Sequence, residues 1–578
     1  MRKYTFLSLA AAALLFTACS TDDNPGGGSE EAGASKYLAV NIMNVGNAPT
    51  SRAVAGYEDG TQNESVISKV RFYFFHADGS PYILKKTTQD NMTDGDNANW
   101  LETTNPDNAG KDEDKTVEQI TKSVLVINGT TASAPASIIA VINPQSLTDG
   151  GTVLGSGAIN LNTLRQTIKD SKFTTLKGDS ITDFVMSNSV YANAGASVCS
   201  SLVSGHVKES ADDALSDPVD IYVERVVAKV QASVNEDSLK LGDGHNWETT
   251  KYGIKVGTYG NNTPIYAVVD GWGVADEDGQ AEIEKQIDVN WTGANLGIEP
   301  WTTSDYHRSF WSKSVPFTAG TGGNQPVNHK FTDYTANFGM SLYTLPNTPS
   351  DVKDFANAYD NYLTKFLVAT HLRYEDAQGN WHNAEICKYK GVSYLGVENL
   401  KKQVARDYSK YYTKTGADTY ESLDSADVTF TTSQIESSTT TLKDYQVIPT
   451  LANTSKQYYI NKGSSTHPDW QPVTAATVNT ELAEAPAEVR TDGMAYYYVP
   501  IRHLASDPTK VGYYGVVRNH FYKISLRRIA GFGTPVYDKN KIIDPTIPSD
   551  ANTYLAARIN VLQWRVVSQE VDLDKTQK

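Results

Sequence analysis

Stretches in which hydrophobic and polar residues alternate recur along the whole chain and predict β-strands. Residues 36–45 show the pattern clearly, with Leu38, Val40 and Ile42 separated by Ala39 and Asn41. A period of two in sequence rich in β-branched residues is typical of a strand with one apolar face. Residues 217–234 and 516–533 are longer runs of the same kind.

Two hairpins and one helix are predicted between these runs. Residues 67–84 and 366–386 each read as two strands joined by a polar turn, and Asp78-Gly79 forms the turn of the first. Residues 397–412 instead have a helical period, and the apolar face consists of Val397, Leu400, Val404 and Tyr408. Residues 87–120 are rich in Asn, Asp and Gly and predict a surface excursion without core positions.

Strands and helices do not alternate as they do in parallel α/β folds, so the chain is predicted to be mainly β. At 578 residues it is too long for one core. We expect two transthyretin-like β-sandwich domains in tandem with minor helix. The polar sequence after Asn235 places their boundary near residue 245, giving domains at 53–245 and 246–540.

The C-terminal segment 541–578 combines a tether with a strand. Two prolines within 538–550 indicate a tether rather than a tight turn. In the strand that follows, the apolar positions change parity after Val561: Ala557, Ile559 and Val561, then Leu562, Trp564 and Val566. The sequence therefore predicts an apolar strand at the end of the chain, without showing which sheet it joins.

The N-terminus indicates export. Arg2 and Lys3 precede an apolar run at 4–16 that is too short to span a bilayer permanently. The run leads to "FTAC", which resembles a lipobox ending at Cys19. A lipoprotein signal peptide at 1–19 is thus predicted, the alternative being an ordinary signal peptide with an incidental Cys. A Gly-rich spacer follows.

Composition excludes several function classes. The net charge of −16 offers no basic surface for nucleic acid. The Walker loop, the G-x-S-x-G elbow and the H-E-x-x-H helix are all missing from the sequence, so we predict a non-enzyme without cofactor or metal. His371 and His382 near Cys387 lack a metal-ligand spacing. Cys199 and Cys387 are expected to be free buried thiols, although the sequence also permits a disulfide.

Three Asp-Ser-aliphatic triplets resemble a bacterial O-glycosylation sequon. Such triplets also arise by chance, so they are candidates only. The serines concerned are Ser180, Ser238 and Ser425.

Several segments together resemble the Bacteroidales fimbrillins, the type V pilus subunits, and most closely the shaft subunits of the minor fimbrium. They are "VERVVAKVQASV" (223–234), "LPNT" (345–348), "VVRNHFYKISLRRI" (516–529) and "VLQWRVVSQEVDL" (561–573). The resemblance implies a surface lipoprotein precursor whose first strand is cut away by a trypsin-like protease. The terminal strand of another subunit then fills the vacated groove.

Mapped onto this chain, the propeptide is 20–52, with cleavage between Arg52 and Ala53. Arg52 is the only Lys or Arg between Lys36 and Lys69, in sequence typical of an exposed loop, although a lone loop Arg is ordinarily just solvated. The removable strand contains Tyr37, Leu38, Val40 and Ile42. The donor strand contains Leu555, Ala557, Ile559, Val561, Leu562, Trp564, Val566 and Val571.

The function expected from this resemblance is that of a fimbrial shaft subunit supporting adhesion, colonisation and biofilm. Its partners would be identical subunits head to tail, an Arg-specific protease, and further tip and anchor subunits. Its location would change from outer-membrane lipoprotein to surface fimbrium. The alternatives are a tip adhesin, which accepts a strand without giving one, and a monomeric surface glycan-binding lipoprotein.

Overall fold

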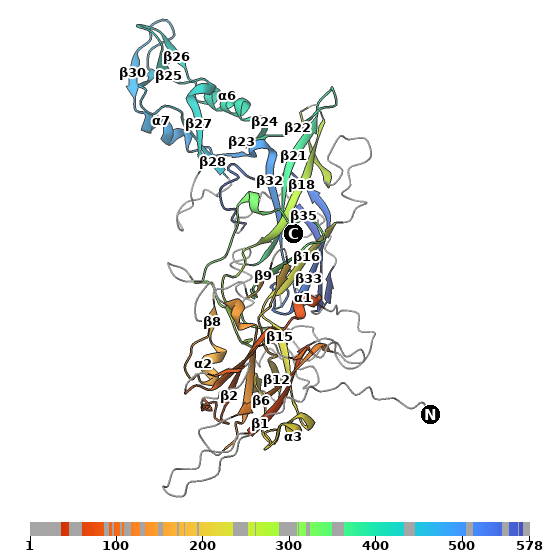
Figure 1. Ribbon diagram of the computed structural model, residues 1–578. Coiled ribbons are helices and arrows are strands. Elements are labelled where there is room, and N and C mark those ends of the chain that lie inside the picture. The colour runs from red at the N-terminus through yellow and green to blue at the C-terminus, as the bar shows by residue number, and fades with distance from the viewer. Residues whose placement is uncertain are drawn as a thin grey trace.

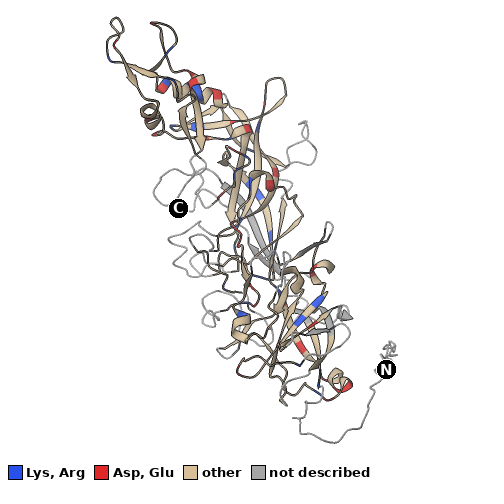
Figure 2. Ribbon diagram, turned by 60° about the vertical axis from the view of Figure 1, so that its left-hand side comes forward, with Lys and Arg blue, Asp and Glu red and all other residues tan. Residues whose placement is uncertain are grey.

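The structure is a computed structural model. It describes residues 36–45, 60–85, 92–94, 97–104, 107–108, 117–127, 133–147, 154–169, 173–177, 180–193, 196–234, 252–260, 262–287, 309, 311–318, 324–348, 363–432, 446–504, 512–545, 554–563 and 566–569. The described part is elongated, with the first sheet at one end (Figures 1 and 2).

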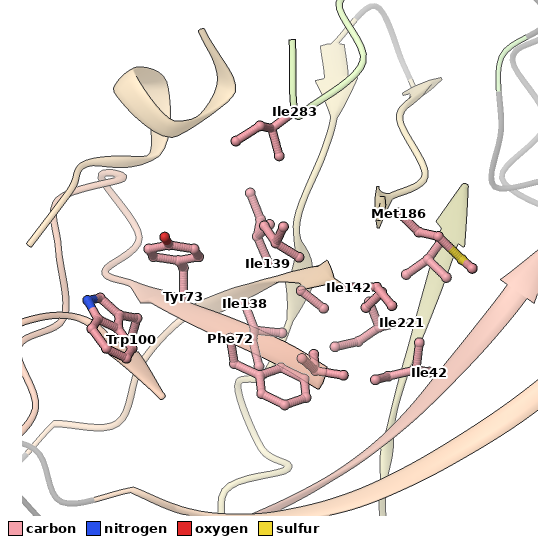
Figure 3. Close-up of a cluster of buried hydrophobic side chains, with 14 of the residues drawn as sticks. Ile42, Phe72, Tyr73, Trp100, Ile138, Ile139, Ile142, Met186, Ile221 and Ile283 are labelled. Carbon is pink, nitrogen blue, oxygen red and sulfur yellow. The ribbon is translucent and has the colours of Figure 1, made fainter. Parts of the chain in front are cut away.

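The first sheet is built from the N-terminal part of the chain. Along its hydrogen-bonded path the strands are β3 (Met92–Asp94), β4 (Trp100–Thr104), β2 (Lys69–Phe75), β7 (Ser137–Ile142), β11 (Met186–Asn188), β15 (Val219–Arg225), β1 (Lys36–Val45), β6 (Val117–Ile127) and β5 (Asp107–Asn108), and β14 (Ser201–Leu202) pairs with β7. The apolar side chains of this sheet meet in one core, part of which Figure 3 shows.

Two further sheets pack face to face in the middle of the molecule. One contains β20 (Ser341–Thr344), β16 (Ala228–Val234), β33 (His520–Ala530), β35 (Tyr554–Gln563) and β36 (Val566–Gln569). The other contains β17 (Gly253–Tyr259), β18 (Thr263–Ala275), β21 (Lys365–Glu375), β32 (Met494–Pro500) and β34 (Thr534–Pro535), with β22 (Trp381–Asn383) paired to β21. Their shared core centres on Trp272, Val368 and Ile524.

A third body lies at the end of the molecule farthest from β1 (Figure 1). It consists of two small sheets and two helices around a core of its own, which includes Leu400, Val404 and Tyr458. Its elements are β23 (Ile386–Tyr389), β24 (Val392–Leu395), α6 (Val397–Asp407), β25 (Tyr411–Lys414), β26 (Tyr420–Ser422), β27 (Val428–Thr432), β28 (Gln446–Leu451), β29 (Tyr458–Asn461), β30 (Trp470–Val473), α7 (Ala475–Leu482) and β31 (Ala487–Val489).

Short elements complete the fold. They are α1 (Gln62–Ser65), η1 (Pro144–Leu147), α2 (Leu161–Arg165), β8 (Ile168–Lys169), β9 (Thr175–Lys177), β10 (Ser180–Thr182), β12 (Tyr191–Asn193), β13 (Ala196–Val198), α3 (Ala211–Ser216), β19 (Ala281–Glu282), η4 (Phe331–Asp333), η5 (Ser425–Asp427) and η6 (Thr491–Gly493).

The predicted mainly β architecture is confirmed, as are the first strand, the hairpin β21–β22 and the helix α6. The turn at Asp78-Gly79 also forms, and Gly79 has a φ of +80° that suits glycine. The predicted strand run at 217–234 is divided between two sheets, because β15 ends at Arg225 and β16 begins at Ala228. The sheets therefore change before residue 245, and the predicted domain limits stay a prediction.

Two sequence expectations about surface segments are wrong. The polar stretch 87–120 contributes β4, in which Leu101 is fully buried against β2. The loop after the first strand contains α1, where Glu64 is 1% exposed. In both cases a few buried residues lie within a stretch that is polar on average. The hydrophobic pattern of the stretch therefore does not predict their burial.

Candidate functional site

The first strand, β1, lies inside the first sheet and uses both of its backbone edges. It runs antiparallel to β6, beginning with Lys36 opposite Ile127. On its other side it runs parallel to β15, from Val40 opposite Val219 to Asn44 opposite Val223. Removing β1 would therefore leave a groove between β6 and β15 with unpaired N–H and C=O groups on both rims.

Three side chains of β1 point into the core, as their alternation predicts. Leu38, Val40 and Ile42 are each at most 1% exposed. Figure 3 shows Ile42 among the core residues Ile221 and Ile142. Each such side chain contributes about 1.5–3 kcal/mol when it is buried, so the resident strand is held firmly.

The outer face of β1 is more varied. Ala39 is only 2% exposed, which leaves room for a small side chain alone at that position. Tyr37 and Asn41 are half-buried. The Asn41 amide donates a hydrogen bond of 2.9 Å from Nδ2 to Oδ1 of Asp220, an exposed residue of β15.

The segment before α3 clamps the beginning of β1. Tyr37 N donates to Lys208 O and Lys208 N donates to Tyr37 O, both at 2.8 Å. The Lys208 ammonium also lies 2.8 Å from Asp217 Oδ2. This hydrogen bond from Lys208 lowers the pKa of the Asp217 carboxyl. The rim formed by β15 thus continues through Lys208, a contribution that the sequence pattern does not reveal.

The C-terminal strand is placed elsewhere in its own chain. β35 pairs antiparallel with β33, with Ile559 opposite Ile524 and Ala557 opposite Leu526. β36 pairs with β35 at the end of the same sheet. The predicted donor positions Leu555, Ala557, Ile559, Val561 and Leu562 lie in β35 and Val566 lies in β36. The structure does not bring them to β1.

The Val-Glu-Arg motif at 223–225 lies where the first sheet meets the second. Arg225 is fully buried, and its Nε donates to Glu64 O at 2.8 Å. Lys229 Nζ lies 2.7 Å from Glu64 Oε1, and the Tyr343 hydroxyl donates to the same oxygen at 2.5 Å. Burial opposes ionisation of Glu64, but the charges of Arg225 and Lys229 leave its pKa below the usual value. α1 is thereby fixed to both sheets.

Arg518 makes a second connection between the two sheets. Its guanidinium donates to Ile283 O at 3.0 Å and to Ser187 Oγ at 3.3 Å. Glu284 nearby is fully buried, and desolvation raises its pKa to about 8 despite the charges of Arg518 and Arg165. The Arg518 guanidinium thus connects the segment before β33 with β11 and with the segment after β19.

Several other candidates can be located. Cys199 and Cys387 are free and buried, and burial raises their pKa to about 11 and about 12. Ser180 is exposed and Ser425 half-buried. Six predicted residues lie outside the described residues: Cys19, Arg52, Ala53, Ser238, Trp564 and Val571.

The described histidines show no shared metal-binding arrangement. His371 and His382 bond to different carboxylates, Asp270 and Asp376. The described part of the chain holds no cluster of three or more His, Cys, Asp or Glu placed to bind a metal. Within the same part, the helices are too short or too polar to cross a membrane.

Comparison with known proteins identifies the C-terminal region. Residues 490–570 match the family model described as "Major fimbrial subunit protein type IV, Fimbrillin, C-terminal". This range begins just before β32 and contains β33 and β35. The fimbrillin resemblance expected from the sequence is thereby confirmed in this region. No curated protein matches the chain.

Three solved structures are similar to this chain over most of its length. A fimbrilin (FimA) from Porphyromonas gingivalis has 12% identity, with 92% of this chain and 99% of that chain covered and a TM-score of 0.34. The tip fimbrial protein Mfa3 from the same species has 8% identity, with 92% and 100% covered and a TM-score of 0.28. A fimbrial assembly protein from Parabacteroides distasonis has 8% identity, 93% and 100% coverage and a TM-score of 0.25.

Proposed function

We propose that this fimbrillin-like chain is the shaft subunit of a surface fimbria and polymerises by exchanging strands between identical subunits. In the proposal, β1 is the strand that leaves and the C-terminal strand of another subunit is the strand that enters. Adhesion, colonisation and biofilm formation would follow from the fibre.

The observation that carries the proposal is the position of β1. It is an interior strand with buried side chains, yet it is the first described element and precedes Arg52, the only Lys or Arg between Lys36 and Lys69. A cut there would free an entire interior strand from its covalent connection to the sheet.

The energetics explain why a cut is needed. The three buried side chains alone contribute roughly 5–9 kcal/mol, and each backbone hydrogen bond adds about 1 kcal/mol. A covalently attached strand also has an effective concentration in the millimolar range. A strand from another molecule cannot displace it until the connection is broken.

The entering strand has its own obstacle. β35 is paired with β33 of its own chain, so it must leave that position before it reaches another subunit. Both strands needed for assembly are therefore occupied in the uncut chain, which would keep the precursor monomeric. A head-to-tail contact that does not close then produces an open filament.

The proposed partners are identical subunits, an Arg-specific trypsin-like protease, and tip and anchor subunits of the same fibre. We place the precursor in the outer membrane as a lipoprotein attached through Cys19, and the processed form in the fibre on the surface. Ser180, Ser238 and Ser425 stay candidate glycosylation sites.

Limited proteolysis of the purified precursor without the lipidated Cys tests this function. Trypsin should create a new N-terminus at Ala53 and give ladders in SDS gels without boiling. Arg52→Ala should abolish both, whereas the neighbouring Ser51→Ala should change neither. Ladders from the uncut Arg52→Ala chain would contradict the proposal.

A second variant distinguishes a shaft subunit from a tip adhesin. Deleting residues 554–578 removes the donor strand and should abolish the ladders while cleavage continues. A tip adhesin or a monomeric binding protein would instead be cut and stay monomeric in its full-length form.

A further inference from the structure

A short sequence from β1 recurs in the C-terminal strand. Residues 37–42 read Tyr-Leu-Ala-Val-Asn-Ile, and residues 554–559 read Tyr-Leu-Ala-Ala-Arg-Ile. Tyr, Leu, Ala and Ile occur at equivalent positions in both, and the remaining positions are an aliphatic one and a polar one. The two segments come from opposite ends of the chain and from different sheets, β1 and β35.

We propose that residues 554–559 of a second copy replace residues 37–42 residue for residue, and that Arg558 then pairs with Asp220 of the accepting subunit. This inference rests on the proposed strand exchange and specifies its register. Tyr554 takes the place of Tyr37, Leu555 that of Leu38, and Ile559 that of Ile42.

The burial of β1 selects this register. The groove needs apolar side chains at the places of Leu38, Val40 and Ile42, and a small one at the place of Ala39, which is 2% exposed. In the proposed register Ala556 occupies that small position. Leu555 and Ile559 fill the two outer apolar positions.

Shifted registers fail at the small position. Moving the strand by two residues in one direction puts Arg558 at the place of Ala39, and moving it in the other direction puts Tyr554 there. Both side chains are too large for a site whose occupant is almost fully buried. Because a shift by one residue exchanges the two faces of the strand, it is excluded by the alternation.

The second half of the terminal segment fits less well. Placing Leu562 at the position of Leu38 would bring Gln563 to the small site and Trp564 to the place of Val40. A buried polar side chain and an oversized ring both oppose that arrangement. The groove therefore selects the first half of the segment and leaves the Leu562–Val566 half for another surface.

Charge complementarity supports the same register. Asp220 lies directly opposite Asn41 in the parallel pairing of β1 with β15 and accepts the hydrogen bond of the Asn41 amide. Arg558 would occupy the place of Asn41, so a neutral donor is replaced by a guanidinium facing a carboxylate.

At one position the incoming strand fits the groove less well than β1 does. Val40 is 1% exposed, and its counterpart Ala557 lacks two methyl groups. The incoming strand therefore leaves a small void that the resident strand fills. Ala557→Val should slow dissociation of the complex by about four- to fifteenfold, since filling such a void is worth roughly one or two buried methylene groups.

A defined dimer tests the register by crosslinking. The acceptor is a trypsin-cut chain lacking residues 554–578 and carrying Val124→Cys. Val124 lies opposite Ala39 across β1 and β6. The donor carries Arg52→Ala, so it cannot accept a strand, together with Ala556→Cys. We expect an interchain disulfide with Ala556→Cys and none with Arg558→Cys, which lies two residues farther along the same face.

The possible outcomes distinguish an error in the proposed register from a failure of the proposed strand exchange. If no dimer forms even without the added cysteines, strand exchange itself fails. If the dimer forms but the Val124→Cys acceptor crosslinks to the Arg558→Cys donor instead of the Ala556→Cys donor, only the register is wrong.

A charge exchange provides a second readout that needs no cysteine. Arg558→Glu in the donor should weaken the dimer about two- to tenfold, as expected for an exposed ion pair turned repulsive, and Asp220→Arg in the acceptor should restore it. Equal weakening by Arg558→Glu with either acceptor would overturn the pairing.

Discussion

Tyr37 and Lys208 exchange two backbone hydrogen bonds of 2.8 Å, one in each direction. They lie far apart in sequence, yet this pair extends the rim of the groove beyond the first residue of β15, Val219. β1 is thus held on both edges near its beginning, with β6 opposite. Leaving the sheet requires both rims to open.

Lys208→Pro should weaken this clamp. Proline lacks the N–H that donates to Tyr37, so about 1 kcal/mol of local stability should be lost. Hydrogen exchange at Tyr37 should become faster, and processed subunits should release β1 sooner. Lys208→Ala is the matched control, because it keeps the N–H and loses only the side-chain contacts of Lys208 with Asp217 and with Gly205 O. Equal exchange rates in the two variants would argue against a role for the backbone pair.

Leu38→Ala should destabilise the uncut precursor. The side chain is fully buried, so its truncation should lower the free energy of unfolding by about 2–5 kcal/mol. Urea denaturation measures the change. Since the resident strand then binds more weakly, we also expect slow ladder formation after Arg52 cleavage to become faster. Tyr37→Phe, at a half-buried position of the same strand, should have little effect on either quantity.

Glu64→Gln should weaken the joint between the first two sheets, mainly at neutral pH. The pKa of Glu64 is lowered in the folded chain, so its contribution to stability is present above its unfolded pKa near 4.5 and disappears as the pH falls through the folded value. Melting temperatures from pH 3 to 7 should therefore depend less on pH in the variant. The exposed Glu398, changed to Gln, is the control. An unchanged pH dependence in Glu64→Gln would contradict the assignment.

Glu284→Gln should have the opposite pH signature. The pKa of Glu284 is raised to about 8, so the folded chain holds its proton more tightly than the unfolded chain between pH 4.5 and 8. This group therefore lowers stability as the pH rises through that window. The variant should lose that trend and be more stable at pH 8, by on the order of 1–3 kcal/mol. Thermal unfolding at pH 5 and pH 8 measures it; a variant less stable at pH 8 would contradict the account.

Some features of this fold can be predicted from the sequence and others cannot, depending on whether neighbouring or distant residues determine them. The alternation of Leu38, Val40 and Ile42 predicts both the strand and its buried face, because successive side chains of a strand point to opposite faces. The helical period around Leu400 is equally direct. Leu101 and Glu64 could not be found in this way, since their burial depends on distant partners, β2 and Arg225.

The sequence also does not predict which strands pair with one another. The alternation in the C-terminal strand predicts an apolar face but not which sheet receives it, and the structure pairs β35 with β33 of the same chain. The continuous apolar run around Val226 likewise conceals the change from the first sheet to the second.

The most direct test of the account is the mass of the chains within a purified SDS-stable oligomer. Strand replacement predicts that every chain that accepts a strand begins at Ala53 and that no peptide containing residues 36–45 is retained. An oligomer that still contains this peptide, bound at one copy per subunit, would show that β1 stays in its groove and would contradict the account.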